Sequence, residues 1–524
     1  MARVRNILFV MCDQLRADYL GCTGHPTIET PHIDALARRG VTFSRAFCQS
    51  PVCGPSRMSF YTGRYVSSHG ATWNNVPLPV GELTLGDHLR PAGLSVALIG
   101  KTHMKADSEG MARLGIDKAS TLGVRLGECG FDPWTRHDGL HPKGYGAGEP
   151  AYNDYLRARG YVADNPWESF ANAAEGPGGA VLSGWQMRNA RLPTRVREED
   201  SETAYVTRLA AGFIREMGER PWCLHLSYIK PHWPYIAPAP YHALYGDNHV
   251  VPAQSDPREL ENAHPVVAAF RSHEESRSFA DPAIRRHVVP TYMGLIKQID
   301  DHLGRLFADM AAQGRLDDTL IVFTSDHGDY LGDHGLGEKE RFHEPSLRVP
   351  LIVVDPDPAA DPTRGRVVDA LAEAIDVVPT CLDALGVAPP GHIVEGRSLV
   401  PFMRGPAPAH WRDAAFSELD YAFRKARNWL GVAPDRARAW MVRTERWKYI
   451  HYEGFRPQLF DLAHDPHEFV DLGDDPGHAV IRAELHERLF AWLRGLKIRV
   501  TISDDEVAAR TGTAAKRGIH IGVW

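Results

Sequence analysis

The fold is decided by the stretch Ile7-Leu8-Phe9-Val10-Met11-Cys12, a continuous apolar run that Asp13 closes. An unbroken apolar run of strand length predicts a parallel strand that is covered on both faces. The run is too short to span a membrane and too short for the apolar part of a secretory signal. We therefore expect a buried strand with an acidic residue at its carboxyl end.

Outward from this strand, three further strand-like runs lie at residues 94–99, 222–228 and 319–324. Helical patterns lie between them. Residues 30–40 begin with a threonine and a proline and end at a glycine, which are helix start and stop signals. Residues 292–310 place apolar side chains three or four positions apart, as an amphipathic helix does. Strands separated by helices predict an α/β fold with a large central, mostly parallel sheet flanked by helices.

Two later regions differ in character. Residues 105–200 are rich in glycine, proline and isolated aromatic residues, so we expect long loops over one face of the core that shape a pocket. Beyond residue 401, strand patterns at 439–450 and 458–462 and an amphipathic helix at 479–496 predict a small α+β subdomain.

We therefore expect a large domain over residues 1–400, the subdomain over 401–500 and a tail over 501–524. The tail is polar and then ends in the apolar residues Ile519, Ile521, Val523 and Trp524. Because a free tail would leave these side chains in water, we expect it to dock on the body or on a neighbouring subunit. The chain is therefore predicted to form a homo-oligomer through this arm.

Composition excludes several classes of protein. The 524 residues are 43% hydrophobic and 24% charged, which is the composition of a globular chain. Lysine and arginine total 59 against 66 acidic residues, for a net charge of −7, so broad binding to nucleic acid is not expected. Seven cysteines in a long chain without an export signal favour free thiols. We expect a cytoplasmic protein without a nucleic-acid or membrane partner.

Polar side chains follow each predicted strand at the point where the strand ends. They are Asp13, Lys101, His103, Lys230, His232, Asp326 and His327. Because the carboxyl ends of parallel strands lie along one edge of a sheet, we expect these residues to converge. Two carboxylates, several imidazoles and several cations in one crevice suit a divalent metal ion and an oxyanion.

A second motif is Cys53-Gly54-Pro55-Ser56-Arg57, followed shortly by Thr62-Gly63-Arg64. This run resembles the C-x-P-S-R signature of the type I sulfatases in the alkaline phosphatase superfamily. The resemblance implies that a formylglycine-generating maturation enzyme oxidises Cys53 to formylglycine, whose hydrated aldehyde is the nucleophile. The related phosphonate monoester hydrolases share this device.

The resemblance covers most of residues 1 to 500. Residues 100–103 are similar to a sulfatase G-K-x-H element, residues 231–234 to a P-H-x-P element, and residues 324–328 to a second metal-binding turn. Lys339 and residues 348–353 resemble the segment that supplies a sulfate-binding lysine, and residues 443–449 resemble the family's small sheet domain. The resemblance implies an alkaline phosphatase-like fold.

The resemblance also implies one divalent metal ion, with Asp13, the modified Cys53, Asp326 and His327 as its ligands. Many sulfatases carry two adjacent aspartates at the first turn and an Asp-Asn pair at the later one. Here Gln14 follows Asp13, and His327 follows Asp326, a combination similar to choline sulfatases and phosphonate monoester hydrolases. An imidazole in place of an oxygen ligand favours Mn²⁺, and Ca²⁺ stays open.

The remaining site residues receive roles from the resemblance. Arg57 is expected to steady the diol, and Lys101 and Lys339 to hold the oxyanion. His232 is the candidate general acid to the leaving alcohol, and it also contacts the substrate. His103 is the candidate base. Asn74, in Trp73-Asn74-Asn75, is expected to donate a hydrogen bond to a substrate oxygen.

The activity implied by the resemblance is arylsulfatase-like hydrolysis of sulfate monoesters, with side activity on phosphorus esters. One hydroxyl of the diol attacks sulfur, and the second loses its proton so that the hemiacetal expels sulfate by C–O cleavage. The Lys101 and His103 pair favours sulfate. A phosphonate monoester hydrolase or phosphodiesterase is the alternative within the same fold, and a non-catalytic binding protein is the alternative of another class.

Two other groups of polar residues have ordinary explanations. Glycines surround Asp329, Asp333 and His334, so we expect at least two of these three to be loop residues or to lie behind the metal ligands. The group His137, Asp138 and His141 has no strand before it and no counterpart in the family pattern. We expect it to be a solvated loop.

Overall fold

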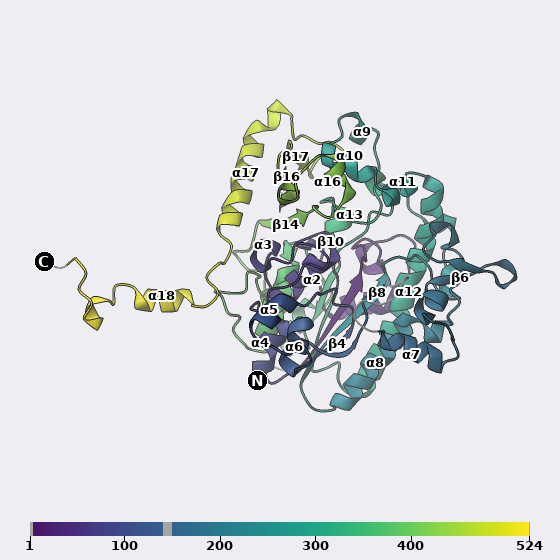
Figure 1. Cartoon of the computed structure of the whole chain (residues 1–524), viewed down its shortest axis with the longest axis horizontal. Helices are drawn as coiled ribbons and strands as arrows, with labels where there is room; N and C mark the ends of the chain where they lie inside the picture. Colours follow the sequence, from purple (N-terminus) through teal and green to yellow (C-terminus); the bar gives the residue numbers. More distant parts are fainter. Residues whose placement is uncertain (1–3, 140–148, 523–524) are drawn as a thin grey trace.

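The computed structural model describes residues 4–139 and 149–522 (Figure 1). At its centre lies β1 (Asn6–Asp13), every residue of which is buried. It belongs to an eight-stranded sheet of order β12-β2-β11-β9-β1-β8-β4-β5. The other long strands are β8 (Trp222–Pro231), β9 (Thr319–Ser325) and β4 (Ser95–Gly100). The four strands predicted from apolar runs are therefore neighbours in one sheet.

The sheet is mixed but mostly parallel. β1 runs parallel to β8 and β9, and β4 runs parallel to β8 and to the edge strand β5 (Asp132–Arg136). β11 (Leu351–Val354) is antiparallel to both of its neighbours, β9 and β2 (Val41–Phe43). The other edge is β12 (Arg366–Val368), parallel to β2. The central strands share one direction, so their carboxyl ends lie on one edge.

Both faces of β1 are covered because its side chains alternate between two hydrophobic clusters. Ile7, Phe9 and Met11 pack with residues of α2 (Cys53–Thr62) and α14 (Val377–Ala384). The intervening side chains pack with α1 (Pro31–Arg39), α8 (Glu202–Met217) and α12 (Pro282–Ala312). The continuous apolar run is thus explained by burial on two sides, which confirms the predicted fold class.

The stretch 105–200 contains more regular structure than predicted. It forms α5 (Ser108–Arg113), α6 (Thr121–Gly127) and α7 (Ala151–Ala158) and supplies the edge strand β5. A short hairpin, β6 (Ala173–Glu175) with β7 (Val181–Ser183), follows. The elements are short, and β5 is an edge strand with a proline at its second position, so the sequence pattern around them is weak.

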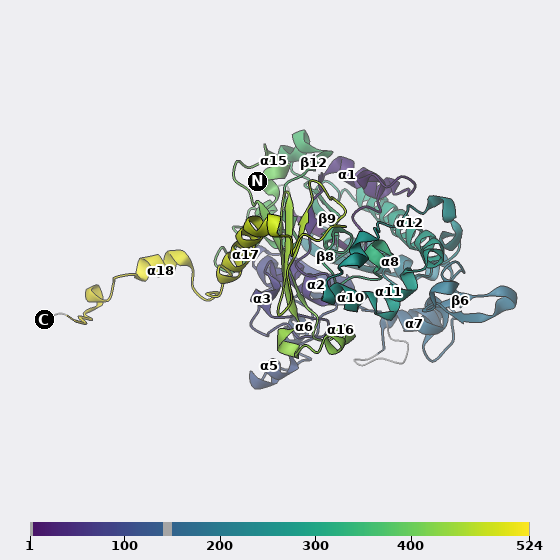
Figure 2. The same ribbon diagram turned by 90° about the horizontal axis from the view of Figure 1, so that it is seen from above.

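The second, smaller domain is an antiparallel sheet of order β14-β15-β16-β17. The stretch predicted as one strand at 439–450 is a hairpin of β15 (Arg438–Thr444) and β16 (Trp447–Tyr452). β14 (Ala414–Asp420) and β17 (Gln458–Asp461) flank it. Leu485 and Leu489 of α17 (Ala479–Arg494) pack against this sheet, beside which the helix lies in Figure 2.

The tail leaves the body after α17 and extends away from it in both views (Figures 1 and 2). It contains α18 (Asp504–Arg510), and Ile498 and Ile521 are about nine-tenths exposed. Within the described residues the tail does not pack on its own chain, so the expectation of docking on the body is wrong. Docking on a neighbouring subunit stays a prediction. Val523 and Trp524 lie outside the described residues.

All seven cysteines are free thiols, as the sequence predicted. Among the described helices, none combines the length and the apolar character that crossing a bilayer requires.

Candidate active site

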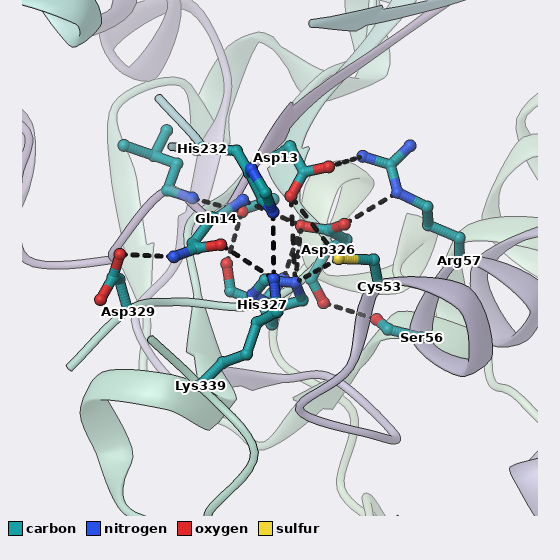
Figure 3. Close-up of polar contacts among 12 residues, drawn as sticks. Asp13, Gln14, Cys53, Ser56, Arg57, His232, Asp326, His327, Asp329 and Lys339 are labelled. Carbon is teal, nitrogen blue, oxygen red and sulfur yellow. Dashed lines mark hydrogen bonds and ion pairs between the residues drawn. The ribbon is translucent and has the colours of Figure 1, made fainter. Parts of the chain in front are cut away.

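The predicted convergence is present at the carboxyl edge of the sheet (Figure 3). Asp13 ends β1, Asp326 and His327 follow β9, and Cys53 is the first residue of α2. One side-chain donor atom from each of these four residues lies within 4.8 Å of every other. Each residue is at most 1% exposed. The structure thus gathers two carboxylate oxygens, one imidazole nitrogen and one sulfur in a buried cluster.

Within this cluster the Cys53 sulfur is central. Its Sγ lies 3.1 Å from His327 Nε2 and 3.8 Å from Asp13 Oδ1. His327 Nε2 lies 3.9 Å from Asp13 Oδ1 and 3.7 Å from Asp326 Oδ1. Oxygen, nitrogen and sulfur donors that point to one place form a donor set that suits a divalent transition metal.

Local contacts place Cys53 at the start of α2. The backbone N–H of Gly54 donates to Asn74 Oδ1 at 2.7 Å, and a Cβ at Gly54 would lie only 2.9 Å from the same oxygen. A glycine at this position therefore leaves room for the close approach of Asn74. Asn74 positions the helix start, and the donation to substrate expected from the sequence stays a prediction.

Arg57 is fully buried one turn along α2 and neutralises both carboxylates. Its Nε donates to Asp326 Oδ2 at 2.8 Å, and its Nη2 donates to Asp13 Oδ2 at 3.2 Å. Its Nη1 donates to the carbonyl of Lys101 and to Ser227 Oγ. Among the described residues no hydrogen bond joins Arg57 to Cys53. Its guanidinium therefore orients the two carboxylates, and the expected steadying of the diol stays a prediction.

Two lysines bring positive charge to the site. Lys101 forms an ion pair with Asp13 Oδ2. Lys339 Nζ lies 2.9 Å from Gln14 Oε1 and 3.2 Å from His232 Nε2. Both ammonium groups are buried and lie near Cys53. The site therefore pairs an anionic cluster with two cations, as the sequence suggested.

The charges of this site shift the pKa of its groups. Burial opposes ionisation of Cys53, but Lys339, Lys101 and His327 lower the pKa of its thiol well below the ordinary value. Burial also opposes protonation of His327, yet Asp326 and Cys53 raise its pKa to about 9. In the absence of a metal ion, the His327 nitrogen therefore holds a proton that a metal ion would displace.

His232 is held in one tautomer. Its Nδ1 lies 2.7 Å from the carbonyl of Trp233, so Nδ1 carries the hydrogen and Nε2 is free to accept from Lys339. Burial and the neighbouring Lys339 lower the pKa of His232. Lys230 donates to the carbonyls of His232 and Pro234 and so fixes this turn.

The turn after β4 carries Lys101 and His103. A Cβ at Gly100 would lie 2.0 Å from the carbonyl oxygen of Ser227, so only glycine fits there. The Asp138 carboxylate accepts the backbone N–H groups of Thr102, at 3.1 Å, and of His103, at 2.9 Å. His103 has a φ of 53°, a strained value that these bonds hold in place.

The expectation of a solvated loop at 137–141 is therefore wrong. His137 is 3% exposed, and Asp138 pairs with Arg136 Nη2 at 2.7 Å while it holds the turn after β4. The reason is that β5 is a strand of the sheet and delivers the residues after it to the same edge. His141 lies outside the described residues.

The residues after His327 lie behind the donor cluster, as expected. Asp329 accepts from Gln14 Nε2 at 2.6 Å and from the Tyr235 hydroxyl at 2.5 Å. Asp333 pairs with Arg16, and His334 with Glu259. Gln14 is the residue that sequence reasoning did not assign, although its place directly after Asp13 was a signal.

A second group of residues with metal-type donor atoms consists of His32, Asp300 and Asp301. Its contacts indicate a structural role. Asp300 Oδ1 accepts the backbone N–H groups of His32 and Ile33 and thus caps α1. This group is structural.

Comparison with known proteins agrees with the geometry. A family model described as Sulfatase matches residues 5–387, and one described as N-sulphoglucosamine sulphohydrolase, C-terminal, matches residues 332–494. The multifunctional alkaline phosphatase superfamily protein PehA of Trinickia caryophylli is 34% identical over 511 residues, which cover 93% of this chain and 95% of PehA.

Two further similarities mark the breadth of the family. The choline-sulfatase of Rhizobium meliloti is 28% identical, and the alignment covers 92% of this chain and 84% of the choline-sulfatase chain. The structure of the phosphonate monoester hydrolase SpPMH from Silicibacter pomeroyi matches with a TM-score of 0.82 and 29% sequence identity. The match covers 96% of this chain and 98% of the SpPMH chain. With a family match over most of the chain and a buried site at the expected strand ends, this protein belongs to the sulfatase family of the alkaline phosphatase superfamily and is an ester hydrolase.

Proposed function

We propose that the protein hydrolyses sulfate monoesters in a reaction that depends on a divalent metal ion and on formylglycine at position 53. The observation that carries this proposal is the position of the Cys53 side chain. It lies in a buried cluster with Asp13, Asp326 and His327, and Lys101 and Lys339 lie close to it.

The donor set fits a single divalent metal ion. Asp13, Asp326, His327 and the modified residue 53 would hold it, and Mn²⁺ or Ca²⁺ would be accommodated. The metal ion would polarise an ester oxygen and help to ionise the nucleophile. Formylglycine would supply the geminal diol, whose second hydroxyl allows release of sulfate without a second attack at sulfur.

The residues of the chain bind and orient the ester. Lys101 and Lys339 balance the negative charge of the reacting group, and Arg57 keeps the two carboxylates fixed. His232 and Lys339 lie within 3.2 Å of each other, so a proton held by this pair can pass to the leaving oxygen. The His103 side chain lies near Cys53, where it can accept the proton of the second hydroxyl.

Peptide mass spectrometry across Cys53, on protein produced with and without the maturation enzyme, tests the nucleophile. We expect an aldehyde and a bound metal ion in the matured protein, with turnover of aryl sulfates. A protein that keeps an unmodified thiol under both conditions and binds no metal would instead be a binding protein.

A phosphonate monoester hydrolase or phosphodiesterase is the second candidate, favoured by the similarity to SpPMH over nearly the whole chain. Sulfate monoesters, phosphodiesters and phosphonate monoesters all carry one negative charge, which suits the same two lysines. Kinetics on an aryl sulfate and on the matching aryl phenylphosphonate decide between them. A much larger kcat/KM on the phosphonate would reverse the order of the two candidates.

Three further expectations accompany this proposal. The protein is a client of a formylglycine-generating enzyme, it is cytoplasmic, and it forms a homo-oligomer through residues 501–524. The exposure of Ile498 and Ile521 supports the last of these.

A further inference from the structure

A cavity of about 230 Å³ lies beside the active site and is not used by the chemistry described above. It adjoins the site at two points of the chain. Trp233, in its wall, directly follows His232, and the two rings stack at 5.7 Å with an interplanar angle of 9°. Glu338, also in its wall, directly precedes Lys339. The cavity therefore lies on the side of the candidate proton donors, where a leaving group departs.

The C-terminal domain closes the same side. Arg424 lines the cavity, and its neighbour Phe423 stacks on Trp73 at 5.8 Å, next to Asn74. Asn74 in turn contacts Gly54, the residue after Cys53. The segment that contains Phe423 and Arg424 thus connects the nucleophile helix to the cavity.

The cavity has aromatic walls that are held in place. Trp185 meets Trp233 edge to face, with ring centroids 5.3 Å apart, and Phe279 adds a third ring. Trp185 Nε1 donates to Glu168 at 2.8 Å, which fixes the orientation of its ring. Trp233 Nε1 is buried and has no hydrogen-bond partner within the described chain, so a donor is available to a bound molecule. Such walls suit a flat ring.

The polar rim of the cavity is acidic. Glu275 forms an ion pair with Arg424, whose Nε also lies 2.7 Å from Glu340. The Glu338 carboxylate forms no direct hydrogen bond or short ion pair with a described residue, although Lys339 and Arg424 lie near enough to interact with it electrostatically. A carboxylate in this wall disfavours a second negative charge on the leaving group.

We propose that this cavity is the leaving-group site and that it selects uncharged aromatic alcohols, with Trp185 as the stacking wall and Glu338 as the group that rejects anionic ones. This inference rests on the proposed function in one respect, because it assumes that the substrate is an ester of such an alcohol. It names two specificity-determining residues, Trp185 and Glu338, from separate segments of the chain.

Binding of the free alcohols tests the cavity without turnover. Methyl 4-hydroxybenzoate and 4-hydroxybenzoate have the same ring, and only the second carries a carboxylate. We expect the uncharged ester to bind the full-length protein more tightly, and Trp185→Ala to weaken its binding roughly tenfold, with Trp185→Phe close to the original protein. Equal binding of the uncharged ester to the original protein and to Trp185→Ala would overturn the proposal.

Kinetics on sulfates of the same two alcohols test the role of charge. We expect the matured enzyme to prefer the uncharged leaving group by roughly tenfold in kcat/KM, and Glu338→Gln to narrow this ratio of the two kcat/KM values severalfold. An unchanged ratio in Glu338→Gln would contradict the proposal. Ethyl sulfate, which lacks a ring, is expected to be indifferent to Trp185→Ala.

Kinetics on the phenylphosphonate esters of the same two alcohols distinguish a failure of this inference from a failure of the proposed function. If only the phosphonates turn over, the preference for sulfate fails, while the effects of Trp185→Ala and Glu338→Gln still decide the cavity. If sulfates turn over but neither variant changes binding or selectivity, the cavity proposal fails and the proposed function stands.

Discussion

The donor cluster around Cys53 and the cavity beside Trp233 are adjacent, yet they are built differently. Asp13, Asp326 and His327 end or follow buried strands of the central sheet, and every donor is at most 1% exposed. The cavity is lined by the segment after β7, the turn after β8, α11 (Glu274–Phe279) and a loop of the C-terminal domain. The proposed chemistry thus lies on buried strand ends, and the proposed selectivity on connecting segments and one short helix.

The largest expected loss of turnover follows from the replacement of Cys53, the proposed nucleophile in the donor cluster. Cys53→Ala removes the residue to be oxidised, so kcat should fall at least about 10⁴-fold on every ester, whatever its leaving group. Steady-state kinetics on paired aryl and alkyl sulfates check this result. Cys48→Ala, a buried thiol outside the donor cluster, is the matched control and should keep turnover.

Removal of one metal ligand comes next. Asp326→Asn should lower the metal content from about one ion per chain and reduce kcat by roughly 10³-fold, because several kcal/mol of charge stabilisation are lost. Elemental analysis of the purified protein measures the metal, and Asp301→Asn in the surface group should leave it unchanged. A full metal complement in Asp326→Asn would contradict the assignment.

The pH dependence of metal binding sharpens the same point. Because His327 holds its proton up to about pH 9 in the unmodified protein, the metal ion must displace that proton below this pH. Affinity should therefore rise as the pH increases toward 9 and level off above it. Titration calorimetry in buffers of different ionisation enthalpy would detect the released proton, and a pH-independent affinity would exclude His327 as a ligand.

His232 lies between the donor cluster and the cavity beside Trp233, and its replacement tests the proposed protonation of the leaving group. His232→Asn should reduce kcat by roughly 10²-fold for poor alkyl leaving groups and much less for nitrophenyl sulfate, because nitrophenoxide leaves without a proton. The slope of log kcat/KM against leaving-group pKa measures this difference. An equal loss for all leaving groups would remove His232 from the role of proton donor.

A smaller effect is expected at Asp138, which touches neither the donor cluster nor the cavity. Asp138→Ala frees the backbone of Thr102 and His103, so the catalytic turn should lose its strained geometry and kcat should fall about 10- to 100-fold. Asp138→Asn keeps an acceptor oxygen and should recover most of this loss. Selectivity between leaving groups should stay constant in both variants.

The smallest effect on turnover is expected from the tail. A chain that ends at Thr501 should keep its kcat and its leaving-group preference, because residues 502–522 lie far from both regions (Figure 1). If the arm bridges subunits, the mass measured by light scattering should fall. An unchanged mass would show that the tail does not hold an oligomer together.

The sequence predicted the central sheet and the donor cluster well. A buried parallel strand needs a continuous apolar run, and the residue that follows it must lie at the carboxyl edge, so Asp13 and Asp326 were placed by local pattern alone. The Cys53 motif located one member of the donor cluster, because the arginine four positions later is needed for the contacts with both carboxylates.

Other features depended on contacts between distant segments. Asp138 was predicted to be a solvated loop residue because the weak pattern of β5 hid the strand that delivers it. The hydrogen bond from Asn74 to a substrate oxygen stays a prediction, but the sequence did not show that its Oδ1 accepts the N–H of Gly54 at the start of α2. The position of Trp185 opposite Trp233 depends on the path of a hairpin that no periodicity describes.

The sequence by itself determined the sheet, the place of Cys53 and the donor types, because strand burial and a tight helix start are properties of neighbouring residues. Only the tertiary structure decided which side chains orient the turn after β4 and which line the cavity beside Trp233. These contacts join residues up to hundreds of positions apart, and loop paths and domain packing bring them together.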